Sequence, residues 1–381
     1  MAALWKTLEV GNVLLTAPRR WGKSSVMAAL ADAPQPGWSV AMADFEYVEH
    51  PAEFLTELVA LLLLDDPVAR LLKQATRAPG ALARWVAVVS PELAFSRPEI
   101  GELKVRLGKA LPSTAAWPEL TEELLALMSK REGSLLIIID EFPMMIGNFI
   151  QRDRDSAIHF LKWFRAQRQR LPGHIRFLLG GSVNIEPVLE GLGVVALLND
   201  LERFHLQPME REKSIRFVRE VLAGEGCEAE EDAIITITDA IGTGVHFFLQ
   251  VLLSECISEA RRRNTTLTAD QVRSAYEQRV LGPFSRGRFS HYQSRLKSNY
   301  GPLEQPARIV LGHLAETESA TLQELRQVLV IASFADVPAS DVVARLESDF
   351  YVTVQRGAVS FSSRFLRDWW RLNAPAVVSL R

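Results

Sequence analysis

The fold of this chain is indicated most clearly by residues 12–25, Asn-Val-Leu-Leu-Thr-Ala-Pro-Arg-Arg-Trp-Gly-Lys-Ser-Ser. They open with a short apolar run, residues 13–15, which is typical of a buried strand. A loop ending in Gly22-Lys23-Ser24 follows, and residues 25–30 then have a helical pattern. A strand, a loop that ends in G-K-S and a helix together indicate a phosphate-binding P-loop.

The residue types of this loop suit the binding of ATP with Mg²⁺. Backbone N–H groups at a helix N-terminus carry partial positive charge toward a phosphate. Lys23 adds a full charge toward the β- and γ-phosphates, and the Ser24 hydroxyl is the expected Mg²⁺ ligand. Ala17 replaces the first glycine of the motif, which is tolerable if its φ is negative and costly if it is positive. The residues expected to bind ATP here are Ala17, Pro18, Arg19, Arg20, Trp21, Gly22, Lys23, Ser24 and Ser25. The alternative is a chance G-K-S at a helix start.

A second motif lies downstream, where residues 135–139 form an unbroken apolar run that ends in Asp140 and Glu141. Such runs are strands buried on both faces of a parallel sheet. Their carboxyl ends lie at the sheet edge where α/β proteins bind ligands. We expect Asp140 to hold Mg²⁺, as a Walker-B aspartate does, and Glu141 to act as general base toward the attacking water. The alternative is a strand that simply ends in two solvated acids.

Length and composition predict a cytoplasmic protein of two or three domains. The chain has 381 residues, of which 48% are hydrophobic, and a net charge of −3, so it lacks a general basic field for nucleic acid or anionic membrane. Cys227 and Cys256 have no metal-ligand spacing, which favours a reducing compartment. The N-terminus leads almost at once into the first strand without a signal peptide pattern, and the longest apolar runs are too short to span a bilayer.

Strands and helices alternate through about residue 206, which predicts a parallel sheet. The expected strands after the first are residues 39–44, 135–139, 176–180 and 203–206. The expected helices after the P-loop helix are residues 51–64, 118–131 and 153–170. Five prolines interrupt residues 65–115, which we interpret as an irregular insertion with short helices.

The remainder of the chain is predicted to be mostly helical. Residues 210–280 contain four helical patterns, and a basic, aromatic stretch, 284–300, follows them. Three further helices, 305–317, 321–330 and 340–350, precede a hairpin of residues 351–355 and 358–362. Three helices and a hairpin are the layout of a winged helix-turn-helix. The predicted domains are therefore an α/β P-loop core (1–208), a helical domain (209–281), a linker (282–302) and a winged-helix domain (303–381).

These motifs together resemble the archaeal-type ATPases, which are AAA+/STAND-related P-loop NTPases. Residues 17–25 resemble the family's G-P-R-R-x-G-K-[ST]-S loop, and residues 136–142 resemble its Walker-B strand with D-E-F. The end of the family's fourth strand is matched by residues 180–182, and its passage into the lid by residues 201–217. Its lid segment G-x-P-[YF]-x-L-Q resembles residues 244–250, and the end of its winged helix resembles residues 361–370. The resemblance covers most of the chain except residues 65–115.

The resemblance implies roles for four further residues. Ser182 or Asn184 would occupy the sensor-1 position, and Arg203 would be an arginine finger that acts on the ATP of a neighbouring subunit. His246 stands where the family usually has proline, so it is either a polar lid residue that senses nucleotide or a partly buried structural histidine. Turn residues and a solvated arginine are the ordinary alternatives for the first three.

Nucleic acid is not the favoured partner. The helix expected at 340–350 has the place of a recognition helix, but it carries Asp341, Glu347 and Asp349 against Arg345 alone. A different surface has the residue types for binding a backbone and stacking bases: Arg279, Arg286, Arg288, His291, Arg295 and Lys297 with Phe284, Phe289 and Tyr292. We favour the alternative, a linker whose aromatic side chains pack on the lid.

The resemblance therefore implies an ATP-hydrolysing switch or remodelling ATPase that acts on a protein partner, with homo-oligomers formed where Arg203 acts in trans. One alternative is a nucleotide-gated regulator or scaffold with little turnover. A second is a DNA-associated AAA+ ATPase of a defence or mobile-element system, and a third is a small-molecule kinase. The lid and the winged helix argue against the kinase, because they supply no acceptor pocket. The partner is not specified by the fold.

Overall fold

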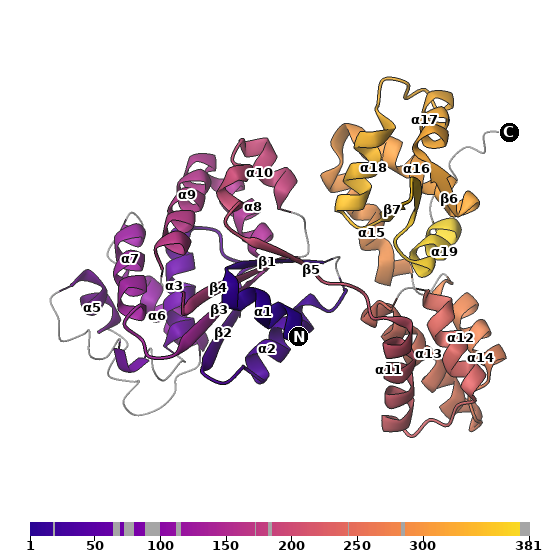
Figure 1. Ribbon diagram of the computed structural model, residues 1–381, viewed down its shortest axis with the longest axis horizontal. Coiled ribbons are helices and arrows are strands. Elements are labelled where there is room, and N and C mark those ends of the chain that lie inside the picture. Colours follow the sequence, from indigo (N-terminus) through magenta and orange to yellow (C-terminus); the bar gives the residue numbers. More distant parts are fainter. Residues whose placement is uncertain are drawn as a thin grey trace. The chain divides into compact units, whose positions relative to one another are not determined.

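The computed structural model describes residues 1–17, 20–63, 69–71, 80–87, 100–111, 116–171, 173–181, 185–242, 244–282 and 286–373 (Figure 1). The chain divides into two compact units. The first comprises Met1–Arg19 and Lys23–Leu206, and the second comprises Arg20–Gly22 and Gln207–Arg381. Each unit has its own hydrophobic core.

The first unit is built on a five-stranded parallel sheet with the strand order β2-β3-β4-β1-β5. Its strands are β1 (Val13–Thr16), β2 (Trp38–Asp44), β3 (Ser134–Asp140), β4 (Ile175–Gly181) and β5 (Glu202–His205). Strand β3 is buried from Leu135 to Asp140. Side chains of a strand alternate between the two faces of a sheet, and the two core clusters show this alternation. Leu135, Ile137 and Ile139 pack on one side, and Leu136 and Ile138 pack on the other.

Helices cover both faces of this sheet (Figure 1). Helices α1 and α2 pack on one face, where Leu4, Trp5 and Met27 join the smaller core cluster. The other face is covered mainly by α3, α7, α8 and α9. The helices of the first unit are α1 (Ala2–Val10), α2 (Lys23–Asp32), α3 (Pro51–Leu62), α5 (Ala81–Val86), α6 (Ile100–Ala110), α7 (Trp117–Met128), α8 (Phe142–Arg152), α9 (Arg154–Arg170) and α10 (Glu186–Leu192), with a 3₁₀ turn at Val195–Leu198.

Three of these helices differ from the sequence-based expectation, and one of them is α10, since no helix was expected over residues 186–192. The chain does not enter the first strand almost at once, because α1 precedes it and buries Leu4, Trp5 and Leu8. Helix α8 was also not expected. It follows β3 after a single residue, Glu141, so the apolar run of the strand continues into the apolar run of the helix without a loop. Pro143 lies in the first turn of α8, where a missing N–H costs nothing.

Two glycines at the end of β4 allow elements to approach closely. A Cβ atom on Gly180 would overlap the end of the Met27 side chain, and one on Gly181 would overlap the ring of Pro143. Met27 belongs to α2 and Pro143 to α8. The missing side chains therefore let both helices come close to the carboxyl end of the central strands.

We expect Gly181→Ala to destabilise the protein by about 1–3 kcal/mol, the usual cost of overpacking. The ring of Pro143 is rigid, so the backbone of β4 or α8 has to move. The matched control is Gly147→Ala within α8, where an added Cβ meets nothing within 4 Å. The control should be neutral or stabilise by up to ~1 kcal/mol, because alanine is the better helix former. Urea unfolding of the full chain measures the free energy of unfolding of both variants. Equal stability of the two would show that the close contact between Gly181 and Pro143 does not contribute to stability.

The second unit is helical, with one small antiparallel sheet of order β6-β8-β7. Its helices are α11 (Arg211–Gly224), α12 (Glu231–Ile241), α13 (His246–Arg263), α14 (Ala269–Ala275), the π-helix Tyr276–Val280, α15 (Arg286–Asn299), the 3₁₀ turn Gly301–Leu303, α16 (Glu304–Thr317), α17 (Leu322–Ile331), α18 (Ala339–Ser348) and α19 (Arg364–Asn373). The strands are β6 (Ser319–Thr321), β7 (Val352–Gln355) and β8 (Ala358–Phe361).

One continuous core runs through the second unit, from Val218 to Trp370. Phe365 of α19 lies at its centre, with its ring centroid 4.4 Å from that of Phe248 and 4.8 Å from that of Phe289. Phe289 and Tyr292 belong to α15 and are buried. The aromatic side chains described in the 284–300 stretch therefore pack inside the protein, and Phe284 lies outside the described residues. No helix among the described residues has the length and apolar character needed to span a bilayer.

Candidate active site

The first half of the candidate site is the N-terminal turn of α2, which follows strand β1. Lys23, Ser24 and Ser25 are the first three residues of this helix. The first N–H groups of a helix have no intrahelical acceptor, so they are available to an anion. The Lys23 side chain is only 5% exposed, whereas Ser24 and Ser25 are exposed.

The second half of the candidate site is the carboxyl end of β3, which lies between β2 and β4 in the sheet. The Ser24 hydroxyl donates a hydrogen bond of 2.7 Å to Asp140 Oδ2. Lys23 Nζ lies 3.8 Å from Asp140 Oδ1 and 4.0 Å from Glu141 Oε1. The fold thus joins residues that are 116 positions apart in sequence. The four residues form a compact site in which one ammonium faces two carboxylates.

Glu141 has an unusual backbone conformation for its residue type. Its φ of 54° and ψ of 31° are left-handed, and it is the N-cap of α8. Such a conformation costs on the order of 1–3 kcal/mol away from glycine, and it is found preferentially at functional sites. The Glu141 N–H donates a hydrogen bond of 2.9 Å to Asp140 Oδ1, which offsets part of this cost. The sharp turn leaves the Glu141 carboxylate within reach of Lys23.

The expected P-loop residues before Lys23 are described in part. Ala17 is buried and is not among the residues with positive φ. Alanine is therefore tolerated here in place of the first glycine of the motif. Arg20 and Gly22 have φ values of 70° and 88°. Within the second unit, to which Arg20–Gly22 are assigned, the Arg20 guanidinium lies 4.5 Å from the Phe247 ring centroid. Pro18 and Arg19 lie outside the described residues.

An acidic loop borders Asp140 on the β2 side. The register of β2 and β3 places Asp44 opposite Asp140. Asp44 Oδ1 accepts a hydrogen bond from the Glu46 N–H, so this carboxylate stabilises the turn after β2. Asn148 of α8 holds the same turn, because its Nδ2 donates to the Glu46 carbonyl at 2.7 Å and to the Val48 carbonyl at 3.3 Å. No local pattern pointed to Asn148, since its partners lie about 100 residues away.

Arg203 lies on β5, the strand at the opposite edge of the sheet. Its Nε and Nη2 atoms lie 2.9 and 2.8 Å from Glu186 Oε1, and the side chain is 40% exposed. It therefore does not join the cluster of Lys23, Asp140 and Glu141. Ser182 and Asn184 lie outside the described residues.

His246 belongs to the second unit, as the first residue of α13. Its ring centroid lies 4.5 Å from that of Phe217. Burial lowers the pKa of His246 below its ordinary value, so the ring is neutral at pH 7. A neutral ring packed on phenylalanine offers no positive charge to a phosphate.

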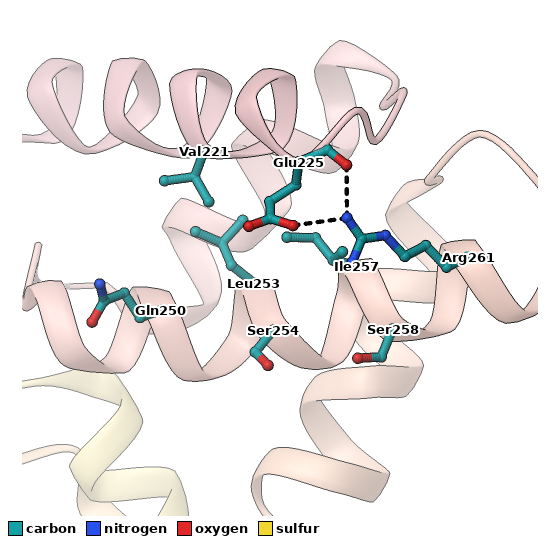
Figure 2. A pocket seen from close by; sticks show the side chains of 8 residues that line it. All are labelled: Val221, Glu225, Gln250, Leu253, Ser254, Ile257, Ser258 and Arg261. Atoms are coloured by element: carbon teal, nitrogen blue, oxygen red, sulfur yellow. Dashed lines mark hydrogen bonds and ion pairs between the residues drawn. The ribbon is translucent and has the colours of Figure 1, made fainter.

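The second unit also contains a groove between α11 and α13, with a volume of about 250 Å³ (Figure 2). Leu253 and Ile257 lie on its apolar side, and Gln250, Ser254 and Ser258 line the adjoining side of α13. An ion pair closes one end, where Arg261 Nη2 lies 2.7 Å from Glu225 Oε2. None of the described residues predicted from the sequence to bind nucleotide lines this groove.

Comparison with known proteins addresses the fold. No protein-family model matches the sequence, and no curated protein matches it. The Walker-type ATPase PABY2304 of Pyrococcus abyssi is similar in structure, with a TM-score of 0.58 at 13% identity, over 97% of this chain and 94% of that one. The ORC2 protein of Aeropyrum pernix, in ADPNP–ADP complexes, aligns with a TM-score of 0.48 at 16% identity, over 95% and 86% of the two chains. The RuvB Holliday junction branch migration motor of Thermotoga maritima aligns at 0.44 and 10% identity, over 94% and 90%.

Of these three structures, the Pyrococcus abyssi ATPase has a TM-score above 0.5, and the fold is inferred from it. Its alignment extends over nearly the whole of both chains. The parallel α/β core predicted from residues 12–25 and 135–141 is confirmed by the observed sheet. This chain therefore has the fold of a Walker-type P-loop ATPase.

Proposed function

We propose that the chain binds and hydrolyses ATP with Mg²⁺ and acts as a switch or remodelling ATPase on a protein partner. The observation that carries this proposal is the cluster at the carboxyl end of β3, where Lys23 faces Asp140 and Glu141 and Ser24 is bonded to Asp140. Each of these four residues has the chemistry that ATP hydrolysis requires.

The donor set suits the proposed ligands. Ser24 Oγ and Asp140 Oδ2 are hard oxygen atoms 2.7 Å apart, and Mg²⁺ prefers oxygen ligands held by one or two protein groups with the remainder from phosphate and water. The Lys23 ammonium and the N–H groups of the first turn of α2 suit phosphate oxygens. Lys23 is paired with carboxylates at 3.8 and 4.0 Å, which are loose contacts that a phosphate can displace.

Catalysis by such a site rests on positioning and charge neutralisation. The bound metal would neutralise the charge on the phosphate oxygens. Lys23 orients the β- and γ-phosphates, and Asp140 holds Ser24 in place. Glu141, whose left-handed conformation directs it toward Lys23, accepts a proton from the attacking water.

The test is phosphate release by the full chain from ATP in the presence and absence of Mg²⁺. We expect Mg²⁺-dependent release without a phosphorylated acceptor. A phosphorylated small molecule would favour a kinase. ATP binding without turnover would favour the nucleotide-gated regulator, and no binding at all would overturn the proposal.

We further propose that the described part of the predicted winged-helix domain, residues 303–373, forms a winged helix that binds protein. Support comes from the order of its elements, with α16, α17 and α18 followed by the hairpin β7–β8 and with β6 paired to β8. In α18 the exposed positions are Ser340, Asp341, Ala344 and Glu347, which carry no cation for a DNA backbone. The buried aromatic rings of α15 cannot stack on bases either.

Arg203 offers a test of assembly. An arginine that acts on the ATP of a neighbouring copy has to leave Glu186 first, since both its Nε and Nη2 lie within hydrogen-bond distance of that carboxylate. We expect light scattering to show larger particles with Mg²⁺ and a slowly hydrolysed ATP analogue than without nucleotide. Arg203→Ala should then lower turnover about 10³-fold without weakening ATP binding. A monomer in both states would remove Arg203 from this role.

A further inference from the structure

Helix α17 exposes an unusual amount of apolar surface for a short helix. It buries Leu325 and Leu329, but Leu322 is 42% exposed, Val330 50% and Ile331 61%. Successive fourth residues of a helix lie on one face. Leu322, Arg326 and Val330 therefore form one row, and Gln323, Gln327 and Ile331 form the row beside it. These six residues are the α17 face.

Arg326 is the one charged residue of the α17 face, and it has no partner among the described residues. Many arginines of the second unit pair with carboxylates, for example Arg211 with Asp239 and Arg219 with Glu231. Arg326 shares its lack of a partner among the described residues with Arg356, but it alone lies between exposed aliphatic side chains of one helix face. The nearest acid in sequence, Glu324, is engaged in capping the helix, where it accepts hydrogen bonds from Thr321. An unpaired guanidinium between two aliphatic side chains suits a partner that brings both apolar contacts and a carboxylate.

The chemistry of the α17 face argues against two other occupants. Nucleic acid is disfavoured because one arginine is its whole positive charge, and the neighbouring helix α18 exposes Asp341 and Glu347. A second copy that packed α17 against α17 about a two-fold axis would place equivalent residues across the axis. Arg326, at the middle of the row, would then face its own copy, and like charges in contact are unfavourable.

We propose that the α17 face docks an amphipathic helix of a partner protein, with apolar residues against Leu322, Val330 and Ile331 and a carboxylate opposite Arg326. Helix-in-groove and helix-on-helix recognition use apolar anchors that recur on one face at spacings of three and four residues. The inference deepens the proposed action on a protein partner and does not depend on ATP hydrolysis.

The experiment selects helical peptides on the immobilised full chain without nucleotide. The probe is a library of single helices about five turns long, with one face randomised. Counter-selection uses the full chain carrying Arg326→Glu and Val330→Ser, both exposed positions whose substitution leaves the core intact. We expect enriched helices with two or more apolar residues on one face and an Asp or Glu between them.

The selected helix then tests the pairing. Its affinity for Arg326→Glu should fall about tenfold, which corresponds to the loss of one charged contact. Replacing its acid with Lys should restore binding to that variant. The matched control is Arg356→Glu, which should leave the affinity unchanged. Arg356 is exposed at the β7–β8 turn and has no partner among the residues that the structure describes.

Three results would overturn the proposal. One is a library in which nothing is enriched over the counter-selected variant. Another is enrichment of basic helices, or of helices that bind both chains equally. The third is self-association in light scattering that Val330→Ser abolishes, which would identify a second copy as the occupant. Phosphate release measured on the same variants should not change, so a failure here is distinguishable from a failure of the ATPase proposal.

Discussion

Lys23→Met is expected to abolish ATP binding, with an affinity loss of more than about 100-fold. A hydrogen bond to a charged group contributes ~1.5–3 kcal/mol, and the upper value already corresponds to a factor above 100. The site adds a second effect in the same direction. Lys23 is the cation that faces Asp140 and Glu141, so its removal leaves two carboxylates that repel the phosphates.

The measurement is titration with a fluorescent ATP analogue and Mg²⁺, checked by the shift that nucleotide causes in thermal unfolding. Methionine keeps most of the apolar stem of this nearly buried side chain, which limits the effect on folding. Lys6→Met is the matched control, since Lys6 is an exposed lysine on α1 of the same unit. Unchanged affinity in Lys23→Met would contradict the assignment of the P-loop.

Glu141→Gln is expected to lower turnover by a factor of about 10²–10⁴ while ATP stays bound, because a glutamine cannot accept the proton of the attacking water. Glutamine has the shape of glutamate, so the left-handed turn into α8 and its hydrogen bond to Asp140 should persist. The substitution also removes one negative charge near Lys23, so binding of the phosphates should be equal or tighter.

Single-turnover hydrolysis and nucleotide affinity measured on the same preparation separate the two effects. Glu202→Gln serves as the control, because Glu202 is an exposed glutamate on β5 away from the cluster. Hydrolysis at the wild-type rate in Glu141→Gln would exclude Glu141 as the general base. A loss of binding would instead show that its carboxylate helps to position Lys23.

Local patterns in the sequence predicted most elements of the first unit. Residues 39–44 and 135–139 were recognised as strands because a buried parallel strand is apolar over its whole length. Helix α8 was missed because the apolar residues of β3 lead into those of the helix, with one left-handed residue between them. Strand β3 and helix α8 are separated by the left-handed backbone of Glu141 alone, and the pattern of apolar residues does not show where one ends and the other begins.

Local sequence alone specifies the residue types of the candidate site, since the expected P-loop and the two acids after β3 each lie within one short stretch. Which of those residues come into contact depends on the arrangement of the strands. The sheet order β2-β3-β4-β1-β5 brings Lys23 and Ser24 to Asp140 and Glu141 and leaves Arg203 at the other edge. The fold alone also shows that Asn148 holds the turn after β2 and that Arg326 has no partner within the described part of the chain. Hydrophobic periodicity indicates which elements form, whereas contacts between distant segments depend on how those elements are ordered and packed.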